Sequence, residues 1–145
     1  MPRYINDIIV HSTATPAGRD VTAKEVDTWH KARGWRGIGY HYLVRLDGTV
    51  ERGRAISQPG SHCRGHNAHS IGIVYVGGTD AAGHAQDTRT EAQKAALLKL
   101  LASLVKMYHC QVHGHRDYAP SQCPSFDAKS EYAGLYKQLA LPSAG

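Results

Sequence analysis

Two short, uninterrupted apolar runs limit the folds that are open to this chain. The first is Ile8-Ile9-Val10 within residues 5–11, and the second spans residues 71–76. Runs of this length that are rich in β-branched residues are typical of strands buried inside a sheet. We expect these strands to alternate with helices around a mixed sheet, as in an α/β or α+β layered domain.

A capping box marks the start of the first helix. Thr22 is followed three residues later by Glu25, so each side chain can satisfy a backbone N–H at the helix start. The helix is predicted to end at Gly34. One face of it follows the spacing i, i+3, i+4, i+7 and holds Val26, Trp29, His30 and Arg33.

The second half of the chain predicts two more helices. Thr90 and Gln93 form a second capping box, which opens a long helix. Its buried stripe is predicted to contain Leu97, Leu100, Leu101, Leu104 and Tyr108. Residues 130–139 predict a closing helix, and residues 77–88 an exposed loop.

Further strands are predicted by alternation and turn signals. Residues 40–46 and 49–52 should pair across the hairpin signal Asp47-Gly48. Period-two alternation would place Tyr40, Tyr42 and Val44 on one face. With a short strand at 111–113, the expected fold is a mixed sheet of about five strands flanked by about three helices. Its length fits one domain spanning residues 1–145.

Three separated side chains suggest a catalytic metal site. His115 and Cys123 lie eight residues apart across an Ala-Pro turn signal, and His11 ends the first strand. Two imidazole nitrogens and one sulfur leave tetrahedral zinc one position for water. His113 competes with His115, although the spacing to Cys123 favours His115. If His113 joined the other three, the site would be a closed structural one.

Charge and hydropathy limit the classes of partner and the cellular location that we expect. The net charge of +5 is explained most simply by solubility, and the alternative is attraction to a polyanion such as nucleic acid or an anionic cell wall. Because no basic run or nucleic-acid-binding signature accompanies this charge, we expect no nucleic acid partner. No apolar run approaches the ~20 residues that a membrane span needs. The first residues lack a long apolar segment, which predicts synthesis in the cytoplasm without a signal peptide.

The remaining cysteines leave two alternatives. Cys63 and Cys110 could be two buried thiols or one bridge. Without a signal peptide, free thiols are favoured.

Several motifs together resemble one family. The chain looks like the zinc-dependent N-acetylmuramoyl-L-alanine amidases, which include small phage lysins and the peptidoglycan recognition proteins. The resemblance covers residues 8–126. The motifs that carry it, in chain order, are Ile9-Val10-His11-Ser12-Thr13, Gly37-Ile38-Gly39-Tyr40-His41-Tyr42, Gly60-Ser61-His62-Cys63-Arg64-Gly65-His66-Asn67, Ser70-Ile71-Gly72-Ile73, and Gly114-His115-Arg116-Asp117 through Cys123-Pro124.

The resemblance implies site residues. His11, His115 and Cys123 would be the ligands of one zinc ion per chain, and Tyr40 the catalytic tyrosine beside it. Ser121 stands where many phage-type members carry a lysine and some recognition proteins a threonine. A serine hydroxyl could stabilise the developing negative charge, although it lacks an ammonium charge.

The loop with His62 and Asn67 leaves two interpretations open. The resemblance places it near the cleft, where both residues would contact the muramyl sugar or the stem peptide. Alternatively, Asn67 only caps a turn in a glycine-rich loop.

The resemblance also implies the reaction. The chain would be a phage or prophage endolysin, a monomer acting on the cell wall. It would cleave the amide between the lactyl group of N-acetylmuramic acid and the L-alanine of the peptidoglycan stem peptide. The alternatives are a cytosolic amidase that recycles muropeptides and a recognition module that binds peptidoglycan without cutting it.

Overall fold

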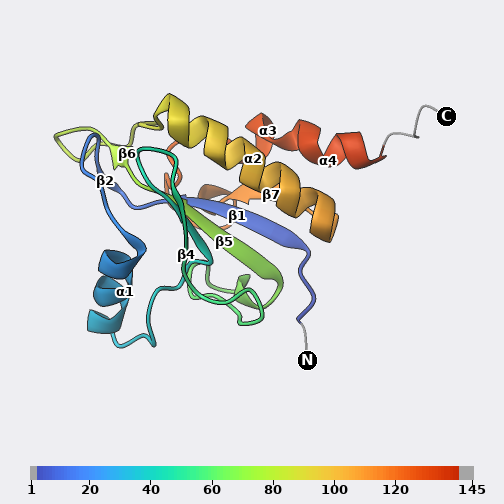
Figure 1. The fold of residues 1–145 in the computed structure, drawn as a ribbon, viewed down its shortest axis with the longest axis horizontal. Coiled ribbons are helices and arrows are strands. Elements are labelled where there is room, and N and C mark those ends of the chain that lie inside the picture. Colours follow the sequence, from blue (N-terminus) through green and yellow to red (C-terminus); the bar gives the residue numbers. More distant parts are fainter. Residues whose placement is uncertain (1–2, 141–145) are drawn as a thin grey trace.

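A five-stranded mixed sheet forms the centre of the fold, as predicted (Figure 1). The computed structural model describes residues 3–140. The strand order is β4-β3-β5-β1-β7, in which β3 and β4 are antiparallel and the other neighbours are parallel. The strands are β1 (Asp7–Ser12), β3 (Tyr42–Val44), β4 (Val50–Arg52), β5 (Ser70–Tyr75) and β7 (Gln111–Gly114). The two apolar runs of the sequence therefore lie side by side in the middle of the sheet.

Helices cover both faces of this sheet (Figure 1). Both predicted capping boxes are formed, at Thr22 for α1 (Ala23–Ala32) and at Thr90 for α2 (Glu91–Tyr108). The short helices α3 (Ala128–Glu131) and α4 (Ala133–Ala140) lie with α2 on the face opposite α1. Within residues 3–140, no helix combines the length and the apolar character needed to cross a membrane.

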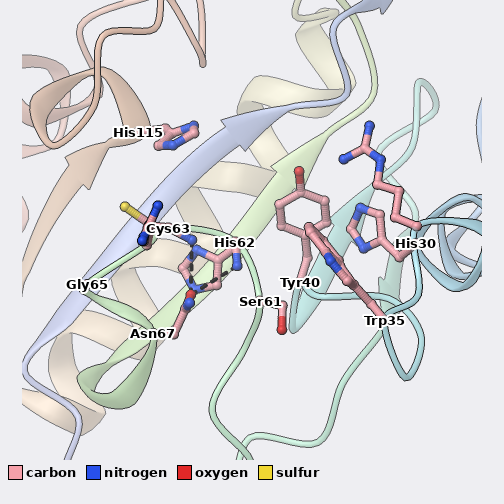
Figure 2. Close-up of a pocket in the computed structure, with 11 residues that line it drawn as sticks. His30, Trp35, Tyr40, Ser61, His62, Cys63, Gly65, Asn67 and His115 are labelled. Carbon is pink, nitrogen blue, oxygen red and sulfur yellow. Dashed lines mark hydrogen bonds between the residues drawn. The ribbon is translucent and has the colours of Figure 1, made fainter.

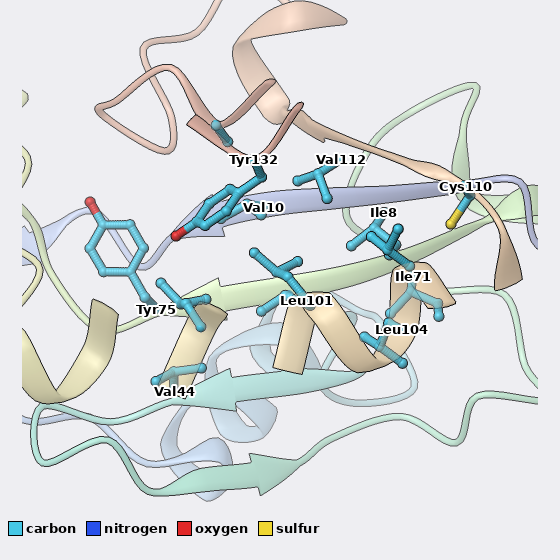
Figure 3. Packing of buried hydrophobic residues seen from close by; sticks show 14 of the residues in the cluster. Ile8, Val10, Val44, Ile71, Tyr75, Leu101, Leu104, Cys110, Val112 and Tyr132 are labelled. Atoms are coloured by element: carbon cyan, nitrogen blue, oxygen red, sulfur yellow. The ribbon is translucent and has the colours of Figure 1, made fainter. Parts of the chain in front are cut away.

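The larger apolar core lies between the sheet and α2 (Figure 3). Ile8 and Val10 of β1 and Leu97 and Leu101 of α2 belong to it and are fully buried. A smaller cluster on the other face joins Val26 of α1 to the sheet. Because side chains alternate along a strand, Ile9 and His11 of β1 point toward the α1 face.

Two predicted segments differ in detail. The expected helix over 130–139 begins at Ala128 and is interrupted at Tyr132, where α3 ends and α4 follows. The expected loop over 77–88 contains the short strand β6 (Gly78–Thr79), which pairs in parallel with β2 (Thr15–Pro16). These two-residue strands carry no periodicity that a sequence pattern could reveal.

The predicted strand over 40–46 was wrong in extent. Only Tyr42–Val44 form β3, and Tyr40 packs on the α1 face while Tyr42 packs on the α2 face. The regular ladder breaks because the adjacent N–H groups of Gly53 and Arg54 donate to the carbonyls of His41 and Tyr40. That irregularity shifts the alternation and moves Tyr40 to the face of His11.

Candidate metal centre

His11, His115 and Cys123 converge at the carboxyl end of β1. One ligand atom from each lies within 4.8 Å of the others, a grouping of the size that can hold one metal ion. His11 is 1% exposed, and the other two are partly buried. Ligand sites commonly form at this end of parallel strands, because the following loops meet there.

Strand register places the two imidazoles together. β1 and β7 are parallel neighbours, and Val10 is the partner of Gly114. His11 follows Val10 and His115 follows Gly114, so the two rings lie side by side with centroids 4.7 Å apart. His115 itself begins the short 3-10 helix η2 (His115–Asp117).

The competing imidazole, that of His113, lies elsewhere. Its Nδ1 is 2.7 Å from Oδ1 of Asp7, at the opposite end of β1. His113 is not in the metal-binding group of residues 3–140. The fourth protein ligand that a closed structural site would need is therefore not supplied by His113.

Backbone hydrogen bonds hold Cys123 close to the carboxyl end of β1. The N–H of Arg116 donates to the carbonyl of Cys123 over 2.7 Å, which closes the turn between the two ligands. The N–H of Ser12 donates to the Cys123 Sγ over 3.2 Å. The Ser121 hydroxyl accepts from the N–H of Cys123 over 3.1 Å, so its own proton stays free to donate.

Burial prepares these groups for a cation. Desolvation lowers the pKa of His11 well below its ordinary value, and the neighbouring His62 and His115 add to this shift. Burial also lowers the pKa of His115, so both rings are neutral at neutral pH. Burial raises the pKa of the Cys123 thiol, against which the Ser12 N–H stabilises the thiolate. Neutral imidazoles and a thiolate are the donor set that zinc prefers.

Tyr40 lies directly beside this group. Its ring centroid is 5.0 Å from that of His11. Burial raises the pKa of its hydroxyl, which therefore stays protonated at neutral pH. No hydrogen bond joins this hydroxyl to another side chain or carbonyl of the described residues. It is thus available as a donor to a bound molecule.

A pocket of about 480 Å³ opens next to the metal-binding group (Figure 2). Figure 2 shows Tyr40 between His62 and His30 on its wall. Gly-rich loop residues and the segment after α1 supply the rest. The lining residues are His30, Arg33, Trp35, Tyr40, Ser61, His62, Cys63, Arg64, Gly65, Asn67 and His115. Ser121 and Cys123 line a separate hollow of about 300 Å³.

Asn67 forms the predicted turn cap and also lines the pocket. Its Oδ1 accepts from the N–H groups of His62 and Cys63, each over 2.9 Å. The His62 ring touches the metal-binding group, since its Nδ1 is 2.8 Å from Nε2 of His11. Burial lowers the pKa of His62 to about 3, so this ring is neutral at neutral pH.

The sequence did not reveal the wall formed by His30 and Trp35. Their rings make an edge contact with centroids 4.5 Å apart, and Nδ1 of His30 accepts from the N–H of Gly39 over 2.9 Å. The helix pattern placed His30 on the buried face but could not tell packing from pocket lining. Cys63 and Cys110 are buried free thiols, as the sequence favoured.

Comparison with known proteins identifies relatives of the whole fold. Residues 1–126 match the N-acetylmuramoyl-L-alanine amidase family. The endolysin of Klebsiella phage KP32 is 46% identical over 125 residues, which cover 86% of this chain and 83% of that protein. The endolysin of Enterobacteria phage T3 is 44% identical over 123 residues, covering 84% and 82%.

A solved structure shares the architecture. The N-acetylmuramoyl-L-alanine amidase LysC from Clostridium intestinale URNW superposes with a TM-score of 0.78 at 31% sequence identity. The alignment covers 97% of this chain and 88% of that one.

Proposed function

The chain belongs to the N-acetylmuramoyl-L-alanine amidase family, and we propose that it is an endolysin that hydrolyses the first amide of the peptidoglycan stem peptide. The scissile bond joins the lactyl group of N-acetylmuramic acid to L-alanine. The observation that carries this proposal is the convergence of His11, His115 and Cys123 beside an open pocket. Its substrate is the cell wall, on which phage endolysins act.

We propose that these three side chains hold one zinc ion. The donor set fits, because two neutral imidazoles converge with a thiol that has a backbone N–H to stabilise its thiolate when a metal displaces the proton. Bound zinc supplies an activated water and an electrophile for the scissile carbonyl. Three protein ligands leave the open position that this chemistry requires.

Tyr40 supplies a hydrogen bond to the reacting carbonyl. Its hydroxyl is protonated and unpaired, so it donates to the oxygen as negative charge develops there. Ser121 is the second donor in this proposal. Its oxygen accepts from the N–H of Cys123, which leaves the hydroxyl proton available to donate.

The pocket holds the muramyl peptide around the scissile bond. Among residues 3–140 the amide NH₂ of Asn67 has no hydrogen-bond partner, because the turn uses only Oδ1. We assign this amide and the ring of His62 to the wall that contacts the sugar or the stem peptide. The aromatic side chain of Trp35 faces the same pocket and is 38% exposed.

A product assay tests the proposal. Purified protein is incubated with intact peptidoglycan, and new alanine N-termini are counted against released reducing sugars. We expect alanine N-termini to rise in proportion to zinc content, with reducing sugars unchanged. Reducing sugars without alanine N-termini would make the chain a glycosidase. Binding without either product would make it a recognition module, and cleavage of soluble muropeptides alone would make it a recycling amidase.

A further inference from the structure

We propose that His62 is a positioning residue for the metal ligand His11. Its Nδ1 accepts the hydrogen bond of the His11 Nε2–H and thereby directs Nδ1 of His11 to the ion. This inference rests on the proposed metal centre, and it adds to that centre a residue that touches no metal.

Both ring nitrogens of His62 have partners within the protein. Nδ1 lies 2.8 Å from Nε2 of His11, and Nε2 lies 3.1 Å from the hydroxyl of Ser70. The two imidazole planes are nearly perpendicular, at 86°. The side chains of His11, His62 and Ser70 form a hydrogen-bonded series that runs from the metal site to β5, where Ser70 is fully buried.

When His11 binds a metal, the protons shared by the His11, His62 and Ser70 side chains can be arranged in one way. A ligating nitrogen carries no proton, so a neutral His11 bound through Nδ1 keeps its proton on Nε2. That proton points at Nδ1 of His62, which must be bare. The His62 proton then sits on Nε2 and donates to Ser70. Ligation through Nε2 of His11 is disfavoured, because His62 already occupies that side.

The surrounding backbone holds the His62 ring in this place. A Cβ atom on Gly72 would lie 2.6 Å from Cδ2 of His62, and one on Gly60 would lie equally close to the same atom. Two glycines therefore leave the space that the ring fills. Asn67 fixes the other end, since it accepts from the His62 N–H. The position is built by packing and does not depend on a flexible side chain.

The hydrogen-bond partner of a metal-binding histidine has a measurable effect on metal affinity. The second ring N–H of such a histidine is almost always donated to an acceptor, and loss of that acceptor typically costs about 10–100-fold in metal affinity. In this chain the acceptor is a neutral imidazole. It orients the ligand without adding negative charge to the site.

Two substitutions separate the acceptor role from simple packing. His62→Asn keeps an oxygen where Nδ1 stands, whereas His62→Gln carries its polar atoms near the position of Nε2 and has none at Nδ1. We expect zinc affinity, measured by chelator competition, to fall about 10–100-fold in His62→Gln and to stay within about threefold of wild type in His62→Asn. The absorption spectrum of the cobalt-substituted protein should change only in His62→Gln.

Matched controls guard against a folding defect. His66→Asn alters the same loop, but its ring stacks on Tyr118 with centroids 3.9 Å apart, so zinc affinity should be unchanged. Thermal unfolding of every metal-free variant reports structural damage separately. If His62→Gln does not fold, Ser70→Ala replaces it, and it should weaken zinc binding by removing the acceptor of the His62 Nε2–H.

Three results would overturn the inference. One is wild-type zinc affinity in His62→Gln with an unchanged cobalt spectrum. Another is an equal loss in the Asn and Gln variants, which would mean that an acceptor at Nδ1 is not what matters. The third, a wild-type protein that binds no zinc, would overturn the metal centre itself and is distinguished from the first two by that measurement.

Discussion

The backbone N–H of Ser12 donates a hydrogen bond to the sulfur of Cys123 over 3.2 Å. This contact joins the end of β1 to a loop 111 residues later in the chain. It places a fixed donor on the one anionic ligand of the proposed metal site. A backbone donor costs no side-chain entropy and is kept by every residue at position 12 except proline.

Cys123→Ser should lose zinc and hydrolysis together. A serine hydroxyl is not ionised at neutral pH and is a poor zinc ligand. Because even the partners of ligands are worth about 10–100-fold in metal affinity, the loss should exceed about 100-fold. Zinc content and released alanine N-termini measure it. Cys110→Ser is the control, since Cys110 is a buried thiol of the α2-side core. Full activity of Cys123→Ser would remove the thiol from the site.

Tyr40→Phe should keep zinc and lose turnover. The hydroxyl has no hydrogen-bond partner among residues 3–140, so its removal leaves no buried group unpaired. Loss of one donor to a developing oxyanion typically lowers the rate by a factor on the order of 100–1,000. The measurement is kcat together with zinc content. Unchanged kcat would exclude the tyrosine hydroxyl from the reaction.

Ser121→Ala should lower kcat about 100-fold if the hydroxyl is the second donor. Ser121→Thr retains a hydroxyl at the same place and should remain near the wild-type rate. Gln122→Ala, at the next position of the same exposed turn, is the matched control. Equal rates for the Ala and Thr variants would show that the hydroxyl does not act in the reaction.

Arg89→Met should destabilise the fold without changing zinc affinity. The Arg89 side chain is 2% exposed, contacts Asp87 and Glu131 at 2.8 and 2.6 Å, and lies 3.4 Å above the ring of Phe126. Removing one partner of a buried ion pair typically costs 3–5 kcal/mol, and the partly exposed acids place this case near about 3 kcal/mol. Urea unfolding measures the change. Lys94→Met, which breaks only an exposed pair, should cost less than about 1 kcal/mol.

The metal-free protein should lose stability as the pH falls from 7 to 5. Burial lowers the pKa of His41 to about 4, against about 6.5 in an unfolded chain. At pH values between these two pKa values, His41 binds a proton in the unfolded chain but not in the folded chain. The free energy of unfolding therefore falls with decreasing pH, by about 1.4 kcal/mol per pH unit for this group.

Urea unfolding in the presence of a chelator checks the slope. His41→Gln should flatten it by the contribution of one histidine. A free energy of unfolding that is equal at pH 7 and pH 5 would contradict the prediction.

Local patterns predicted most of the fold. The capping boxes at Thr22 and Thr90 set both long helices, because the side chains that begin a helix act within one turn. The apolar run Ile8-Ile9-Val10 gave a central strand, since only a strand buried on both faces tolerates such a run. The order of the strands depends on contacts between distant segments, and no local pattern encodes it.

The candidate site likewise has a part that local sequence patterns predicted and a part that they did not. His11, His115 and Cys123 could be proposed from residue type and spacing, and the resemblance added Tyr40. The interpretation of Tyr40 as part of a regular strand put it beside Tyr42 and was wrong. Two neighbouring N–H groups shift the ladder at that point, and such pairing leaves no mark in the sequence.

The amino-acid sequence by itself determined which donors this protein can offer a metal and which segments become helices and strands, because both follow from residue chemistry and short-range periodicity. The tertiary structure alone decided that β7 lies beside β1 with Val10 opposite Gly114, which brings the two imidazoles together. It also decided that His62 faces His11. Both relations arise from packing between segments some fifty to a hundred residues apart, where register and space, and no local preference, select the partner.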